Sequence, residues 1–447
     1  MSPLIRRLSM LVLLLFATTN LYGDDDDVFA DPNMVAGWLG VVTPDKMVYS
    51  SYSTVFESGV AVGIEQMLGG DSGWKLIARA SYSQFSQKAW PTQWQDIQID
   101  QNPDRFQRFM VSGYLFFQHL EDPERRLVVL INGGRSAYIL SNSDKGGLAL
   151  AKEFQDTLSR EVEDNSIYRG RALEYVYEEN VIRFYRGVSA KYDWDSFVYD
   201  EDSKAKIRET IDGFLMKYDR ETWASWGLPL NRGVLLYGPP GTGKSHVGKV
   251  LISQVLRREY PNKTCYIHVG ARHFLYPYSI QAVYQAARML NPCVVFIEDV
   301  DLIAGTNRAS RQMAKNEFMQ QLSGVQPLEG VMTIATTNYG HEIDPALLRS
   351  KRLGYQFEIG YPKRTESLQL LQMFLEKVKL SEDLELTWLN DWLDNLSGAD
   401  LKQFTRLLME EALRNQSFDQ DGRIVIRKVD VEVTKKVWMR TRHKKQG

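Results

Sequence analysis

The segment from Gly238 to Ser245, with the sequence GPPGTGKS, constrains the fold of this chain more than any other. It matches the phosphate-binding pattern GxxxxGK[ST] and directly follows an apolar run at 234–237. Apolar residues at helical spacing follow it through residues 246–260, so the loop is predicted to join a buried strand to a helix. Loops of this kind lie at the carboxyl end of a strand in a parallel sheet, which predicts an α/β nucleotide-binding domain.

Each residue type in the loop has a separate role in the predicted binding of a nucleoside triphosphate. The glycines allow the backbone to turn its N–H groups toward phosphate oxygens. Lys244 supplies a positive charge, and the Ser245 hydroxyl is expected to hold Mg²⁺. The predicted nucleotide-binding residues of this segment are Gly238, Pro239, Pro240, Gly241, Thr242, Gly243, Lys244, Ser245 and His246.

Two further apolar runs end in polar side chains that suit the same chemistry. The run at 293–297 is followed by Glu298 and Asp299, and the run at 331–337 is followed by Asn338. Carboxylates at the end of a buried parallel strand face the phosphate loop. One acid is expected to hold the metal, and the next to polarise the attacking water.

Four segments in this order resemble the AAA ATPases: GPPGTGKS, VVFIEDVD, IATTN and IDPALLRSKR. The resemblance implies ATP and Mg²⁺ as cofactors and ATP hydrolysis as the activity. In that family the strand-end asparagine, here Asn338, senses the γ-phosphate. The two arginines of the last segment act on the ATP of the neighbouring subunit and match Arg349 and Arg352, which implies a ring of identical subunits, expected to be a hexamer.

The chain departs from the family at two points. Where most relatives have Asp-Glu, this chain has Glu298-Asp299, which assigns the metal role to Glu298 and the catalytic base to Asp299. The shorter aspartate reaches less far, and both slower hydrolysis and a compensating backbone shift remain open. Where the family has Phe-Asp after the second arginine, this chain has Leu353-Gly354, so the packing that aims Arg352 is in doubt.

The carboxyl-terminal part, residues 366–447, is expected to be a helical lid because its apolar residues recur at helical spacing. Its segment Ser397-Gly398-Ala399-Asp400-Leu401 is similar to the start of a lid helix in the AAA subgroup of protein unfoldases and membrane proteases, which places Ala399 near the adenine. The layout of residues 194–233 looks most like the group of the mitochondrial Rieske-protein translocase, with backbone near Phe197 and Val198 bordering the adenine. Rings in that group differ in order from the hexamer, and the sequence does not fix the number.

Residues 1–34 form an apolar and acidic amino-terminal segment. The apolar run at 8–17 follows Arg6-Arg7, as in a signal peptide, and is too short to span a bilayer alone. A short membrane tether, a precursor segment and a true start at Met34 all remain open. We expect a cytoplasmic ATPase, with the tether as an option.

Residues 35–190 are predicted to form an α+β domain that binds a protein partner. Strands are predicted at Val60–Ile64, Trp74–Ala80 and Leu127–Ile131, and a helix at Leu148–Glu163. The ATPase domain is expected over residues 191–365. Between its first two motifs, residues 271–278 occupy the place of a pore-lining loop, and both a polypeptide-gripping role for Tyr276 and Tyr278 and a simple helix-start turn remain open.

Composition limits the function classes. The chain has 447 residues, 44% of them apolar and 25% charged, which is ordinary for folded domains. A net charge of −2 argues against a nucleic-acid motor, and no HExxH pattern of a zinc protease is present. We therefore predict ATP hydrolysis coupled to remodelling, unfolding or translocation of a protein. The alternatives are an ATP-dependent assembly switch with slow turnover and, with less support, a nucleic-acid motor.

Overall fold

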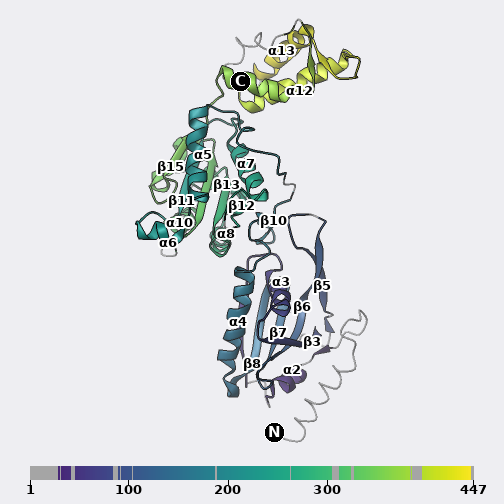
Figure 1. The fold of residues 1–447 in the computed structure, drawn as a ribbon, viewed down its shortest axis with the longest axis vertical. Coiled ribbons are helices and arrows are strands. Elements are labelled where there is room, and N and C mark those ends of the chain that lie inside the picture. The colour runs from purple at the N-terminus through teal and green to yellow at the C-terminus, as the bar shows by residue number, and fades with distance from the viewer. Residues whose placement is uncertain are drawn as a thin grey trace. The chain divides into compact units, whose positions relative to one another are not determined.

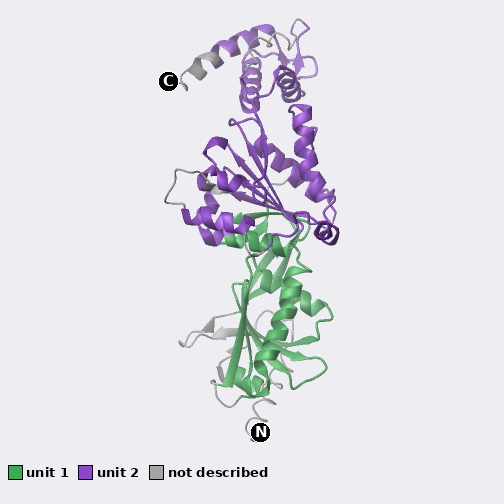
Figure 2. Ribbon diagram, turned by 90° about the vertical axis from the view of Figure 1, so that its left-hand side faces the viewer, with its two compact units in different colours: residues 1–187, 281–291 green, residues 188–280, 292–447 purple. Residues whose placement is uncertain are grey.

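The computed structural model describes residues 29–30, 32–41, 46–83, 89–90, 92–102, 104–186, 189–261, 263–304, 312–323, 327–382, 384 and 395–443. The chain divides into two compact units (Figure 2): unit 1 is residues 1–187 with 281–291, and unit 2 is residues 188–280 with 292–447. No helix within the described ranges is both long and apolar enough to cross a membrane. The apolar run at 8–17 lies outside those ranges.

Unit 1 is built on a mostly antiparallel sheet (Figure 1). The sheet runs in the order β1 (Phe29–Ala30), β3 (Trp74–Ser83), β6 (Phe106–His119), β7 (Arg126–Asn132), β8 (Ser136–Asn142) and β2 (Met47–Ser53), with β4 (Ala89–Trp90) on β3 and β5 (Gln93–Gln98) on β6. Helices lie on both faces. Phe116 packs against Trp38 of α2 (Pro32–Leu39), whereas the next residue, Phe117, packs against Phe154 of α4 (Gly147–Glu163). Successive strand residues point to opposite faces, so one strand anchors both layers.

The strands predicted at Trp74–Ala80 and Leu127–Ile131 and the helix predicted at Leu148–Glu163 are confirmed by β3, β7 and α4. The strand predicted at Val60–Ile64 is wrong, because these residues lie in helix α3 (Gly59–Gly69). All five are buried, so the run has no polar face that would reveal a helical period. An antiparallel hairpin of β9 (Ala172–Val176) and β10 (Val181–Phe184) follows α4 in sequence.

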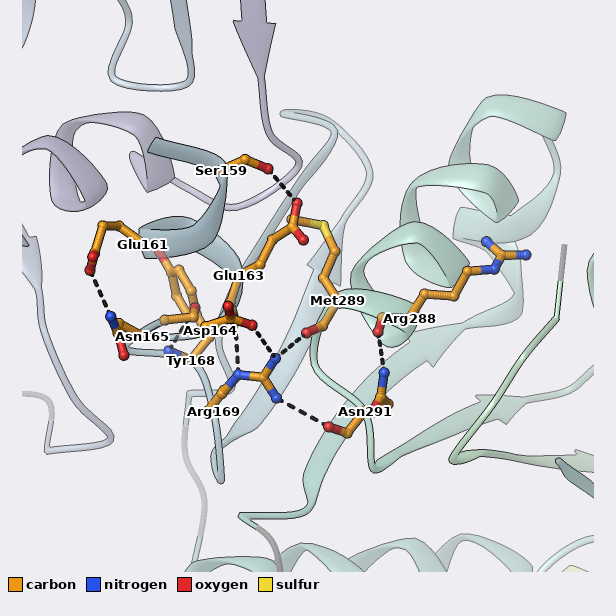
Figure 3. Close-up of polar contacts among 11 residues, drawn as sticks. Ser159, Glu161, Glu163, Asp164, Asn165, Tyr168, Arg169, Arg288, Met289 and Asn291 are labelled. Atoms are coloured by element: carbon orange, nitrogen blue, oxygen red, sulfur yellow. Dashed lines mark hydrogen bonds and ion pairs between the residues drawn. The ribbon is translucent and has the colours of Figure 1, made fainter. Parts of the chain in front are cut away.

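Arg169 joins the ends of two helices within unit 1 (Figure 3). Its Nε donates to the carbonyl of Glu163, the last residue of α4, at 2.7 Å. Its Nη2 donates to the carbonyl of Met289, the last residue of α8 (Pro277–Met289), at 2.6 Å, and its Nη1 to that of Asn291 at 3.1 Å. The last carbonyls of a helix have no partner within the helix, so one guanidinium satisfies two helix ends.

Unit 2 contains a parallel sheet in the order β12 (Cys265–Gly270), β13 (Cys293–Glu298), β14 (Val331–Thr337), β11 (Arg232–Tyr237) and β15 (Tyr355–Glu358). Every residue of β14, and every residue of β13 before Glu298, is buried. Strands buried on both faces have continuous apolar sequences, which is why both were predictable. Cys265 and Cys293 are both buried. With the antiparallel sheet of unit 1, this confirms the predicted α/β class.

Helices of unit 2 flank this sheet and extend beyond it (Figure 1). They include α5 (Glu201–Leu215), α6 (Arg220–Ser225), α7 (Lys244–Leu256), α9 (Asp301–Ala304) and α10 (Gln312–Ser323). The carboxyl-terminal part forms a small helical body of α11 (Arg364–Phe374), α12 (Gly398–Arg414) and α13 (Lys428–His443), with β16 (Lys379–Leu380) paired to β17 (Val425–Ile426). Its core includes Leu371, Leu401, Phe404 and Trp438.

Candidate nucleotide site

The predicted phosphate loop lies between β11 and α7, as the sequence required. Gly238, Gly241 and Gly243 have φ values of 144°, 78° and 113°, in the region that favours glycine. A Cβ at Gly238 would lie 2.2 Å from the carbonyl oxygen of Ile359, and one at Gly241 would lie 2.8 Å from Ala399 Cβ. At Gly238 and Gly241, both the backbone conformation and the lack of space therefore disfavour a larger residue.

Lys244 and Thr242 fasten this loop from within. Lys244 Nζ donates to the carbonyls of Gly238 and Pro239, at 2.8 and 2.7 Å, and burial lowers the pKa of the amine. Thr242 Oγ1 donates to the carbonyls of Pro239 and Ile359, at 2.9 and 2.8 Å. Ser245 is exposed in the first turn of α7, where the unpaired N–H groups of a helix favour an anion.

The two acids stand at the end of β13 beside the end of β14. Glu298 is the last residue of β13. Asp299 has φ 52°, a left-handed conformation, and its N–H donates to Thr336 Oγ1 at 3.3 Å. Asn338 Nδ2 lies 3.5 Å from Asp299 Oδ1. Pairing of the two strands thus brings the predicted base and the predicted sensor together.

The surroundings of Asp299, burial first and then neighbouring carboxylates, raise its pKa above that of an ordinary aspartate. Burial raises its pKa, and the charges of Asp301 and Glu298 raise it further, while Lys244 and Arg272 act in the opposite direction. A carboxylate with a raised pKa accepts a proton more readily.

Residues that sequence reasoning did not single out hold this strand end in place. Thr337 Oγ1 donates to Asp301 Oδ1 at 2.7 Å in a buried position, and the Val300 N–H donates to the Thr336 carbonyl at 2.8 Å. The apolar run 331–335 followed by two threonines was the available signal, but the partner of each hydroxyl depends on strand pairing.

An aromatic segment packs beside the start of α7. Phe197 ring carbon Cε2 would lie 3.1 Å from a Cβ at Gly243, and the rings of Phe197 and His246 are nearly parallel. His246 Nε2 lies 3.0 Å from Ser196 Oγ. Burial lowers the pKa of His246 to about 4, so the imidazole is neutral at pH 7.

The helical body meets the phosphate loop at the start of α12. Ser397 and Asp400 form a reciprocal capping box at this helix start. The Ala399 N–H donates to the Gly241 carbonyl at 3.1 Å. Ala399, predicted to lie near the nucleotide, therefore contacts the loop directly.

The two arginines follow the short 3-10 helix η6 (Pro345–Leu348). Arg349 is exposed, and Arg352 is partly buried. Within the described ranges neither donates to the phosphate loop or to Asp299. The structure thus places Asn338 beside Asp299 and Ala399 beside the phosphate loop, and it leaves both arginines apart from them.

Residues 271–278, in the place of a pore-lining loop, have features both of a helix-start turn and of a surface that could grip a polypeptide. The segment starts with the 3-10 helix η3 (Ala271–Phe274), and α8 begins at Pro277. The rings of Tyr276 and Tyr278 are stacked at 5.5 Å, and both side chains are about half exposed.

Comparison with known proteins finds similarity over this region. The model of the ATPase family associated with various cellular activities (AAA) matches residues 234–361. The chain is 30% identical to Protein CdcH of Halobacterium salinarum over 244 residues, which are 52% of this chain and 31% of that relative. It is 28% identical to the ATP-dependent zinc metalloprotease FtsH of Acaryochloris marina over 246 residues, 52% of this chain and 36% of the relative. It is 32% identical to the Proteasome-activating nucleotidase of Archaeoglobus fulgidus over 211 residues, 44% of this chain and 50% of the relative. The match thus spans half or less of each of these relatives.

Proposed function

We propose that this chain, which matches the AAA family model over residues 234–361, hydrolyses ATP in a ring of identical subunits and uses the free energy to remodel, unfold or translocate a protein partner. The observation that carries the proposal is the meeting of Asp299 and Asn338 at the ends of adjacent strands. Each subunit then supplies a phosphate loop, a base and a sensor, and the next subunit supplies an arginine.

The roles follow from the positions of the side chains. The loop residues 238–245 and the start of α7 bind the triphosphate through backbone N–H groups and Lys244. The glycine-lined loop, the exposed Ser245 hydroxyl and the Glu298 carboxylate suit a magnesium nucleotide, with Ser245 and Glu298 as the metal-holding side chains. Bound Mg²⁺ would neutralise phosphate charge. Asp299 orients and deprotonates the attacking water, and Asn338 contacts the γ-phosphate.

We propose that the adenine of ATP binds beside the start of α7, near Ser196, Phe197 and His246. His246 is neutral and hydrogen-bonded to Ser196, and Phe197 packs against Gly243. Ala399 of the lid contacts the same loop, so lid position and nucleotide contact are linked.

A protein partner is supported by the names of two relatives, a metalloprotease and a proteasome-activating nucleotidase. We propose that the amino-terminal region, residues 35–190, selects this partner and that Tyr276 and Tyr278 contact it. The alternative is an assembly switch with slow turnover. A ring of six subunits, a cytoplasmic location and a tether through residues 8–17 are further parts of the proposal.

The test compares the full chain with its Asp299→Asn variant, measuring ATP turnover per subunit against protein concentration. We expect specific activity to rise with concentration and to vanish in the variant, which still binds ATP. A matched control, Asp202→Asn, removes an exposed acid in the first turn of α5 and should retain wild-type turnover. Absence of turnover in the wild type, with ATP bound, would reject coupled remodelling in favour of the switch.

A further inference from the structure

We propose that the two arginines have different functions: Arg349 reaches the nucleotide of the neighbouring subunit, whereas Arg352 is a positioning residue that holds the Arg349 segment within its own subunit. This inference rests on the proposed ring and its arginines that act in trans. It replaces the equal roles that the sequence resemblance implied.

Arg352 is bound on two sides by its own chain. Its Nε donates to Ser323 Oγ, at the end of α10, at 2.9 Å. Its Nη1 donates to the carbonyl of Ala346, inside η6, at 2.7 Å. Two of the five N–H groups of the guanidinium are thus bound within the chain, and moving the guanidinium away from this position would break both charge-assisted hydrogen bonds.

A second polar link joins the same two elements. Lys315 of α10 lies 2.8 Å from Asp344, and the lysine is 7% exposed. Asp344 also caps η6, because its side chain accepts from the Ala346 N–H at 2.9 Å. The Lys315 ammonium is the main cause of the lowered pKa of Asp344. Helix α10 therefore holds the arginine segment at both ends, at Asp344 and at Arg352.

Backbone packing fixes the same segment against the sheet. A Cβ at Gly233, in β11, would lie 1.8 Å from the Arg352 carbonyl oxygen. The Leu353 N–H donates to the Leu347 carbonyl at 2.9 Å, and both leucine side chains are fully buried. Leu353, one of the two departures from the family, thus anchors the chain directly after Arg352.

Arg349 differs in each respect. It lies between the two anchored points and its side chain is exposed. Its carbonyl accepts from the Arg352 N–H at 2.8 Å, whereas its guanidinium has no hydrogen-bond or ion-pair partner among the described residues. An arginine on a rigid segment with a free guanidinium can donate to a ligand without breaking internal contacts.

The test is a double-mutant cycle on ATP turnover by the full chain. Arg349→Ala should lower kcat on the order of 1,000-fold with little change in KM. Arg352→Gln should lower kcat about 10-fold and Ser323→Ala about 3-fold. The double variant, Arg352→Gln with Ser323→Ala, should be no slower than Arg352→Gln alone. Lys351→Met, which removes the exposed cation between the two arginines, is the matched control and should retain wild-type kcat.

Two outcomes would overturn the positioning role. One is an Arg352→Gln loss as large as that of Arg349→Ala. The other is a multiplicative effect of Arg352→Gln and Ser323→Ala. Wild-type turnover in Arg349→Ala would instead contradict the proposed arginine in trans. In that case the thermal unfolding midpoint is measured for Arg352→Gln, Ser323→Ala and their double variant. Additive changes in the midpoint would then show that the contact between Arg352 and Ser323 contributes nothing to stability, which would reject it as well.

Discussion

Asp299 shows how the exchange of two acids can suit the backbone that carries them. Its φ of 52° lies in the left-handed region, which aspartate enters more readily than glutamate because its short side chain bonds locally. The N–H bond to Thr336 and the contact with Asn338 hold it there. A shorter reach is thus accompanied by a backbone conformation that favours aspartate.

His246 gives the residue-scale prediction. Its pKa is lowered to about 4 by burial, whereas in the unfolded chain it is about 6.5. Between these values the unfolded state binds more protons, so stability should fall as pH decreases from about 6.5 toward 4, by on the order of 1–3 kcal/mol. The midpoint of thermal unfolding should differ less between pH 7.5 and pH 5 in His246→Gln than in the wild type. His341→Gln, at an exposed histidine, serves as control, and equal differences in wild type and His246→Gln would refute the prediction.

At the scale of elements, the start of α12 serves both the lid and the phosphate loop. The capping box of Ser397 and Asp400 fixes the helix start, and the N–H of Ala399, which lies between these two residues, donates to the Gly241 carbonyl. A helix cap is a local interaction, yet here its geometry places a backbone group on the nucleotide loop.

Ser397→Ala should therefore weaken both stability and nucleotide binding. Loss of the cap costs about 1 kcal/mol of stability. The same loss in binding free energy lowers the affinity for ATP about fivefold. Titration with a non-hydrolysable ATP analogue measures the affinity. Asp219→Ala removes an equivalent cap, since Asp219 accepts from the Thr222 N–H at the start of α6. This control should lose stability and keep its affinity, and unchanged binding in Ser397→Ala would contradict the link.

The same scale shows what sequence could predict. The loop 238–245 and the buried strands before Glu298 and Asn338 were predictable because continuous apolar runs mark strands buried on both faces. The run Val60–Ile64 was misassigned because a fully buried helix also lacks a polar face. The contrast between Arg349 and Arg352 was not visible, because it depends on Ser323, 29 residues away on α10.

At the scale of the whole molecule, a site completed by a neighbour predicts complementation between inactive subunits. Arg349→Ala keeps its own Asp299, and Asp299→Asn keeps its own Arg349. Mixed in equal amounts, the two should recover about a quarter of wild-type turnover, since half of the sites keep the base and half of their neighbours keep the arginine. Lys244→Ala mixed with Asp299→Asn should recover nothing, because no subunit then keeps both loop and base. Equal recovery in the two mixtures would argue against action in trans.

The assignment of residues 281–291 to unit 1 has a practical consequence for dissecting the protein. The chain passes between the units three times, near residues 187, 280 and 291, so no single cleavage releases either unit whole. A fragment that starts at residue 188 would keep α8 but lose Arg169, leaving the carbonyls of Met289 and Asn291 without their guanidinium donor. A fragment of this kind therefore differs from the intact chain in more than length. A change in its ATP turnover rate would reflect the loss of the Arg169 hydrogen bonds as well as the loss of the amino-terminal region.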